Sequence, residues 1–261
     1  MRLLLYNIRY GAGIGRRIHL PLPYAGYLKK TGRNLEQIAA FIRDAAPDIA
    51  GLIEVDSGSF RSGKSNQAAT IAREMQHYYI YQSKYARNSL IQKIPVLNKQ
   101  GNAFLTNQEI QSIRYHYFNE GIKRLVIELE LKEIKLFLVH LSLKFRHRQQ
   151  QLRDLYSVIQ NEPKPYVVAG DFNPLRGERE LLEFIAATGL KSANDSGMPS
   201  HPSRCPRRQL DFILYSPEIH TRNFQVPQVK FSDHVPLIWD FEVTQCPGRS
   251  KKPVVLMPAF N

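Results

Sequence analysis

The stretch VVAGDFNPL, residues 167–175, begins as a buried strand and ends in two polar side chains. Residues 167–170 carry no polar side chain, whereas Asp171 and Asn173 follow two positions apart. Alternate side chains of a strand point to the same face, so this pair can aim at one point beyond the strand end. An Asx turn is the alternative, because Asp and Asn often close strands by bonding their own backbone.

Polar side chains recur in or beside the other apolar stretches of the chain. An unpaired polar group in such a place is costly, so one example would mean little but a repeated pattern needs a common cause. The set comprises Asn7, Glu54, Asn102, His140, Asp171, Asn173, Asp211, Asp233 and His234. We expect these side chains to share one polar pocket at a rim of the domain.

The residue types in this set fit one chemistry. Carboxylate and amide oxygens suit a hard cation such as Mg²⁺, with Mn²⁺ as a possible substitute, and the sequence has no Cys/His cluster with zinc spacing. Two histidines can move protons near neutral pH. A cation that clamps the phosphate, a base for water and a donor for the leaving oxygen are what phosphodiester hydrolysis requires.

Many short apolar runs, few helical patterns and no linker predict a single α/β sandwich, in which two mixed β-sheets pack face to face with helices outside. We expect a catalytic domain over 1–245 and a tail, 246–261, that packs on its surface. One helix is expected to begin at Asn34, with Gln37 completing a capping box, and to end at Pro47. Asp56 is expected to cap a turn.

The charge balance is strongly basic. Among 261 residues, 36 Lys and Arg against 23 Asp and Glu give a formal net charge of +13. This excess favours polyanionic partners such as nucleic acid or an anionic membrane surface, although it could simply keep the protein soluble. The apolar run at the N-terminus is too short for a signal peptide, so a cytoplasmic protein is expected.

The ordered series of motifs resembles the endonuclease/exonuclease/phosphatase superfamily, which has the deoxyribonuclease-I-like fold. The matching stretches are LLLYNIRYG (3–11), GLIEVD (51–56), GNAFLT (101–106), LVHLSL (138–143), VAGDFN (168–173), LDFIL (210–214) and SDHVPL (232–237). GDFN and SDH alone would arise by chance, but the whole series in this order is specific. The resemblance implies a four-layer α/β/β/α sandwich and a Mg²⁺-dependent hydrolase of phosphoesters.

The resemblance also implies a role for each matching position. Asn7 and Glu54 match the metal-site pair, with Asp233 nearby; Asp171 and Asn173 match the residues that position water and phosphate. His234 matches the general base, Asp211 the carboxylate that orients it, His140 the second histidine at the phosphate, and Asn102 a phosphate contact. A phosphate-binding arginine is expected among Arg204, Arg207 and Arg208, and we choose Arg208 as the candidate.

A histidine at position 140 resembles the two-histidine branch, which includes deoxyribonucleases, sphingomyelinases and inositol-phosphate phosphatases, and it argues against base-excision repair. The other histidines have no motif around them, so we expect them to be solvated or to lie in the core: His19, His77, His116, His147, His201 and His220. Nucleic acid is the expected substrate. A phospholipid or small phosphoester, and a binding module without catalysis, are the alternatives, and no obligate protein partner is evident.

Overall fold

Two mixed β-sheets form the centre of the protein in a computed structural model that describes residues 1–14, 30–85 and 96–244. Within these ranges each sheet has six strands. The first sheet has the order β11 (Ile219–Gln225), β12 (Leu237–Val243), β1 (Arg2–Asn7), β2 (Ile49–Asp56), β4 (Gln100–Thr106) and β3 (Tyr78–Ser83). The second has the order β5 (Ile110–Tyr117), β6 (Leu125–Leu131), β7 (Lys135–His140), β8 (Tyr166–Asp171), β10 (Asp211–Tyr215) and β9 (Lys191–Ser192).

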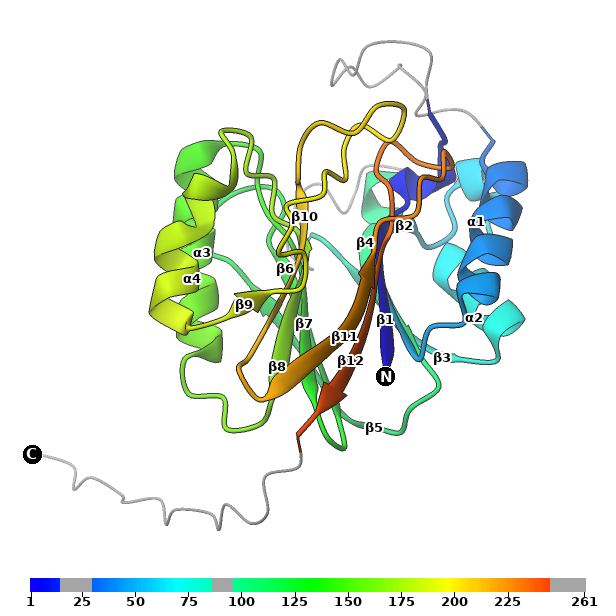
Figure 1. Cartoon of the computed structure of the whole chain (residues 1–261). Coiled ribbons are helices and arrows are strands. Elements are labelled where there is room, and N and C mark those ends of the chain that lie inside the picture. The colour runs from blue at the N-terminus through cyan, green and yellow to red at the C-terminus, as the bar shows by residue number, and fades with distance from the viewer. Residues whose placement is uncertain (15–29, 86–95, 245–261) are drawn as a thin grey trace, which may run out of the picture.

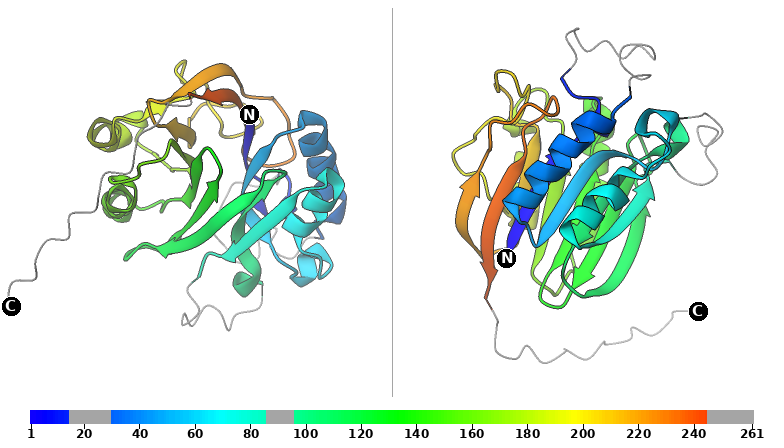
Figure 2. Two further views of the ribbon diagram at one scale, coloured as in Figure 1. Left: turned by 90° about the horizontal axis from the view of Figure 1, so that it is seen from below. Right: turned by 90° about the vertical axis from the view of Figure 1, so that its right-hand side faces the viewer.

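Helices cover the outer face of each sheet. Figures 1 and 2 show α1 (Gly32–Ala45) and α2 (Gln67–Met75) outside the first sheet, and α3 (Phe145–Ile159) and α4 (Leu182–Thr188) outside the second. Short 3₁₀ helices lie at Arg9–Gly11, Phe60–Ser62, Leu97–Lys99 and Glu178–Leu181. The sequence-based prediction of a four-layer α/β/β/α sandwich is confirmed.

The alternation of side chains along each strand builds this layering. On β1, Leu3 and Leu5 enter the core between the sheets, whereas Leu4 packs under α1 and α2. On β7, Leu138 enters the central core and Phe137 packs toward α3 and α4. Both faces of these strands are therefore buried, which explains why they read as continuous apolar runs rather than alternating ones.

Two parallel strand pairs direct polar residues to one edge of the sandwich. β1 pairs in parallel with β2, and β7 pairs in parallel with β8, while the other described pairs are antiparallel. Each parallel pair is joined by a crossover through a helix, α1 and α3 respectively, as parallel pairing requires. Figure 1 shows the loops that follow β1 and precede β10 and β12 gathered at one edge.

The start of the first helix differs from the sequence-based prediction. The first helix begins at Gly32 after Thr31, and Asn34 does not cap it: the Asn34 amide donates to the carbonyls of Gly11 and Phe231, at 3.0 and 2.8 Å. The Asn34 side chain therefore binds two backbone carbonyls that are distant in sequence instead of capping the helix. The predicted tail, 246–261, lies outside the described residues.

Asp56 has the structural role expected of it. Its carboxylate accepts hydrogen bonds from the backbone of Ser59 and Gly58 and pairs with buried Arg61 at 2.9 Å. None of the helices in the described ranges combines the length and the apolar character needed to cross a membrane.

Candidate active site

Strand register places three of the expected residues side by side. His140 pairs with Asp171 across the parallel strands β7 and β8, and Asp211 pairs with Asp171 across the antiparallel strands β8 and β10. Asp171 therefore lies between the other two at the edge of the second sheet. The Nε2 atom of His140 is 3.3 Å from Oδ2 of Asp171, and all three side chains are buried.

His234 completes this group from the loop before β12. Its Nδ1 atom lies 2.7 Å from Oδ2 of Asp211, and the hydroxyl of Ser200 donates to the same oxygen at 2.6 Å. With a proton held at Nδ1 by Asp211, the Nε2 atom of His234 points into the site, 3.9 Å from Oδ2 of Asp171. A carboxylate that fixes the tautomer and orientation of an imidazole is the arrangement that general-base catalysis uses.

Asp171 is also the point where the two sheets meet at the site. Asn7, at the end of β1 in the other sheet, donates from its amide to Oδ2 of Asp171 at 3.2 Å. The backbone N–H of Asn173 donates to Oδ1 of Asp171 at 3.1 Å, which is an Asx turn, and its amide donates to the carbonyl of Leu141 at 3.0 Å. The Asx turn that the sequence allowed is therefore present, and it holds Asn173 directly beyond the end of β8, next to Asp171.

Glu54 lies beside Asn7 because their strands are parallel neighbours, with Asn7 opposite Ile53. The register of β2 against β4 shifts between Leu52 and Val55, and Glu54 within this bulge has a φ of 57°. The Oδ1 atom of Asn102 accepts a hydrogen bond from the backbone N–H of Glu54 at 3.3 Å and supports the bulge. A glutamate held in the left-handed region is strained, and such strain clusters at functional sites.

The donor set at the ends of β1 and β2 fits a divalent cation. Within the described residues, the carboxylate of Glu54 accepts no hydrogen bond and forms no ion pair, although the side chain is only half-exposed. The amide oxygen of Asn7 lies on the neighbouring strand. Asp233 is placed differently, since its Oδ2 atom lies 3.5 Å from Nε of Arg9. Oxygen donors of this type suit Mg²⁺.

Burial and neighbouring charges set the protonation of the site. Burial by itself would raise the pKa of Asp171, but His140, His234 and Lys123 overcome it and hold that pKa well below its usual range. Burial and the Lys123 ammonium lower the pKa of His140. Burial by itself would lower the pKa of His234, but the carboxylates of Asp211, Asp171 and Asp233 outweigh it and raise that pKa to about 10. For Asp211, burial is the largest effect, and it raises the pKa of the carboxyl group.

Three residues at the site escaped the sequence-based interpretation. The ring of His201 lies against that of His234, with centroids 4.8 Å apart and planes tilted by 52°, a position that nothing in the sequence indicated. Ser200 contacts Asp211, and Nζ of Lys123 contacts Nε2 of His140. All three lie in loops without a motif, so no local signal marks them.

Arg208 lies on a hairpin beside the site. Its backbone N–H and carbonyl bond to His201, and the arginine side chains of the hairpin are exposed. We call residues 200–208 the basic hairpin, because they carry the exposed side chains of Arg204, Arg207 and Arg208. The hairpin therefore carries exposed arginines beside the site, while its first residues, Ser200 and His201, contact Asp211 and His234.

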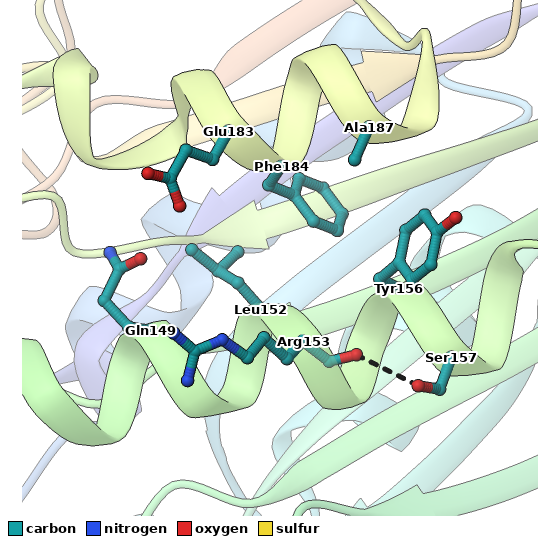
Figure 3. A pocket seen from close by; sticks show the side chains of 8 residues that line it. All are labelled: Gln149, Leu152, Arg153, Tyr156, Ser157, Glu183, Phe184 and Ala187. Atoms are coloured by element: carbon teal, nitrogen blue, oxygen red, sulfur yellow. Dashed lines mark hydrogen bonds between the residues drawn. The ribbon is translucent and has the colours of Figure 1, made fainter.

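A separate groove of about 320 Å³ lies between α3 and α4 in the outer layer. Figure 3 shows Leu152, Phe184 and Tyr156 along the space between these helices. Its walls carry none of the carboxylate–imidazole contacts found at the sheet edge.

Comparison with known proteins agrees with this geometry. A model of the Endonuclease/Exonuclease/phosphatase family matches residues 4–234. The chain belongs to this family. Its members are hydrolases that act on phosphoesters. The match runs from β1 to His234 and so includes every strand end that supplies the polar group.

Solved structures share the fold at low sequence identity. The endonuclease/exonuclease/phosphatase protein of Beutenbergia cavernae is 18% identical, with a TM-score of 0.70 over 93% of this chain and 71% of that one. The catalytic domain of human Nocturnin is 22% identical, with a TM-score of 0.66 over 94% and 93%. The 3′ phosphatase NExo from Neisseria, bound to a product DNA hairpin, is 15% identical, with a TM-score of 0.65 over 93% and 99%.

Two curated relatives from Vibrio vulnificus, the UPF0294 proteins VV2535 and VV1_1880, are each 26% identical over 119 residues. The match spans 41% of this chain and 38% of the length of those relatives.

Proposed function

We propose that this protein is a divalent-metal-dependent phosphodiesterase that hydrolyses nucleic acid. The observation that carries the proposal is the buried chain of contacts from Asp211 through His234 to Asp171, with His140 on the other side of Asp171. It brings together the imidazole of His234, oriented by Asp211, the imidazole of His140 and the carboxylate of Asp171. Hydrolysis by an activated water requires such an arrangement of a base, a proton donor and a carboxylate.

In this proposal Asn7, Glu54 and Asp233 hold Mg²⁺, or Mn²⁺ in its place. The bound cation would neutralise charge on the phosphate and make the phosphorus easier to attack. To bind the cation, Asp233 would exchange its contact with Arg9, which is long at 3.5 Å, while the hydroxyl of Ser232 donates to its other oxygen at 3.2 Å.

The chain's own residues divide the proton chemistry. His234 accepts the proton of the attacking water at Nε2 once the negative charge around it is neutralised, since those carboxylates are what keep its pKa at about 10. Asp211 holds the proton at Nδ1. Asn173 and Asp171 position the water, and His140, next to Lys123, contacts the phosphate or assists the leaving oxygen.

Nucleic acid is favoured over other phosphoesters by charge. The chain carries +13, and the basic hairpin with Arg204, Arg207 and Arg208 lies beside His234. Arginines in this position suit a phosphate backbone that extends away from the scissile bond. Asn102, close to Glu54, is proposed as a further phosphate contact.

The test is a substrate panel run with Mg²⁺ and with chelator. It contains single- and double-stranded DNA, RNA, phospholipid vesicles and a chromogenic phosphodiester. His234→Ala is expected to lower the rate by about 10²–10⁴-fold, the usual scale for a general base. His220→Ala, at an exposed position of β11, is the matched control.

The outcomes separate the alternatives. Metal-dependent cutting of nucleic acid that His234→Ala abolishes supports the proposal. Cleavage of the lipid or of the small diester alone keeps the site and replaces the substrate. An unchanged rate in His234→Ala removes this histidine from the mechanism.

The charge argument has its own measurement. Arg208→Ala should weaken nucleic-acid binding and reduce the slope of log affinity against log salt by about 1, since one phosphate contact is lost. Arg153→Ala, at an exposed position of α3, should leave the slope unchanged.

A further inference from the structure

His201 is fixed beside His234 by backbone hydrogen bonds on both sides of the catalytic loop. The N–H of Val235 donates to the carbonyl of Ser200 at 2.9 Å, and the N–H of Ser203 donates to the carbonyl of Asp233 at 2.7 Å. These two hydrogen bonds therefore join residues on either side of His201 to residues on either side of His234. The ring contact between the two histidines is therefore part of a built structure rather than a chance approach of surface side chains.

Three donor atoms converge at this place. One ligand atom each from His201, Asp233 and His234 lies within 4.8 Å of the others. Around a zinc ion with bond lengths of about 2.0–2.1 Å, tetrahedral donors stand roughly 3.3 Å apart. The widest donor–donor separation would therefore have to shorten by about 1.5 Å for all three to bind one ion.

The surroundings of His234 complete the pattern. Its Nδ1 atom is engaged by the carboxylate of Asp211, which leaves Nε2 as the ligand atom. Metal-binding histidines commonly have this carboxylate partner on the second ring nitrogen, because it fixes the ring and strengthens the ligand. The hydroxyl of Ser200 donates a hydrogen bond to the same oxygen of Asp211, which helps to fix the position of this carboxylate.

The ligand types differ from those proposed for Mg²⁺. Two imidazoles and one carboxylate suit a borderline transition metal such as Zn²⁺, whereas Mg²⁺ prefers oxygen donors and keeps its waters. Glu54 and Asn7 offer only oxygens, on the strand ends of the first sheet. Asp233 is the residue that both sets would share, and its 3.5 Å contact with Arg9 would have to yield in either case.

We propose that His201, Asp233 and His234 form a binding site for a transition metal ion of the Zn²⁺ type, and that its occupation inhibits the enzyme. Inhibition follows because the bound ion takes Nε2 of His234, the atom to which the proposed function assigns the proton of the attacking water. The inhibitory part rests on that proposed function, but the metal site itself does not.

Binding is measured first, on the full chain and without any substrate. Co²⁺ serves as the spectroscopic probe, and Zn²⁺ binding is followed by calorimetry. The wild type should bind one ion at this site and show visible absorption bands of Co²⁺ bound to nitrogen. His201→Phe keeps a ring against His234 but removes the ligand, so it should lose those bands and weaken Zn²⁺ binding at least about tenfold. His220→Phe, at an exposed position of β11, is the matched control and should bind like the wild type.

Inhibition is measured second, in saturating Mg²⁺, with each variant normalised to its own rate without Zn²⁺. The midpoint of inhibition by Zn²⁺ should rise at least about tenfold in His201→Phe and stay unchanged in His220→Phe. The fold of each variant is checked by the fluorescence of Trp239, and His201→Asn replaces the phenylalanine variant if that one misfolds.

Equal Zn²⁺ affinity and identical Co²⁺ spectra in wild type and His201→Phe would overturn the site. Binding that depends on His201 but leaves hydrolysis unaffected, or stimulates it, would overturn the inhibitory role. If no substrate is hydrolysed at all, the proposed function fails, and the Co²⁺ and Zn²⁺ binding measurements still decide the site.

Discussion

Replacing Lys84 with methionine is expected to make the stability of the protein less dependent on pH between 7 and 9.5. Lys84 follows β3 and is only 8% exposed. Its ammonium donates to the hydroxyl of Tyr10 at 2.7 Å and lies over the rings of Tyr10 and Tyr85. No carboxylate pairs with it in the described part of the chain, and the charge of Glu54 only partly offsets its burial.

The magnitude follows from proton linkage. Burial, the largest cause, lowers the pKa of Lys84 from 10.5 to about 8, with Lys123 and Arg61 acting in the same direction. The unfolded chain therefore binds more protons than the folded protein between these two pKa values, and stability must rise with pH across that window. Burying Lys84 costs about 3 kcal/mol at pH 7, where the side chain is mostly charged, and about 1 kcal/mol at pH 9.5, where it is neutral in the folded protein, so the wild type recovers about 2 kcal/mol.

The assay is urea unfolding in the presence of a chelator, followed by the fluorescence of Trp239, the chain's one tryptophan, which is fully buried. The difference in unfolding free energy between Lys84→Met and the wild type should shrink by about 2 kcal/mol from pH 7 to pH 9.5. Other groups that titrate in this range cancel in the difference. Lys230→Met, at an exposed position, should show no such trend. A constant difference for Lys84→Met would refute the argument that its ammonium is held in a poorly solvated place.

Two further substitutions test the site, and a third tests the backbone of the loop at Gly121. Asp211→Asn should lower turnover of a chromogenic diester by about 10²–10⁴-fold with unchanged circular dichroism, because His234 loses the acceptor that holds its Nδ1 proton; full activity would contradict that role. Glu54→Gln should raise the Mg²⁺ concentration for half-maximal activity at least about tenfold in a metal titration, whereas a large fall in Tm with an unaltered metal response would make Glu54 structural. Gly121→Ala should destabilise the protein by about 1–3 kcal/mol in urea unfolding, because φ is 91° and a Cβ would stand 2.7 Å from Nε2 of Gln151; a stability equal to the wild type would show that the loop can move aside.

The strand ends were predictable from the sequence because their signal is local. A buried strand followed by Asp or Asn changes polarity within a few residues, and the period of two then states which side chains share a face. Asp171, His140 and Asp211 could be expected at one edge on this basis, and the register of β7, β8 and β10 places them side by side. The four layers followed from the same runs of apolar residues.

The loop residues of the site were not predictable, because contacts far apart in sequence position them. Lys123 reaches His140 from a loop whose backbone is tied to α3: the amide of Gln151 donates to the carbonyls of Glu120 and Lys123, at 2.8 and 2.7 Å. His201 depends in the same way on the bonds between its hairpin and residues 233–235. The start of α1 failed for a related reason, since Asn34 is used to bind distant carbonyls.

The backbone at the site supports a functional rather than a structural origin for these polar residues. Glu54 in β2 and Asn173 just after β8 both have positive φ, 57° and 51°. Asn tolerates this conformation, but a glutamate there is strained and could be replaced by glycine at no steric cost. A fold that needed only the bulge in β2 would be better served by glycine at position 54. The strained glutamate, whose carboxylate has no partner within the described chain, is therefore best explained by what its side chain binds.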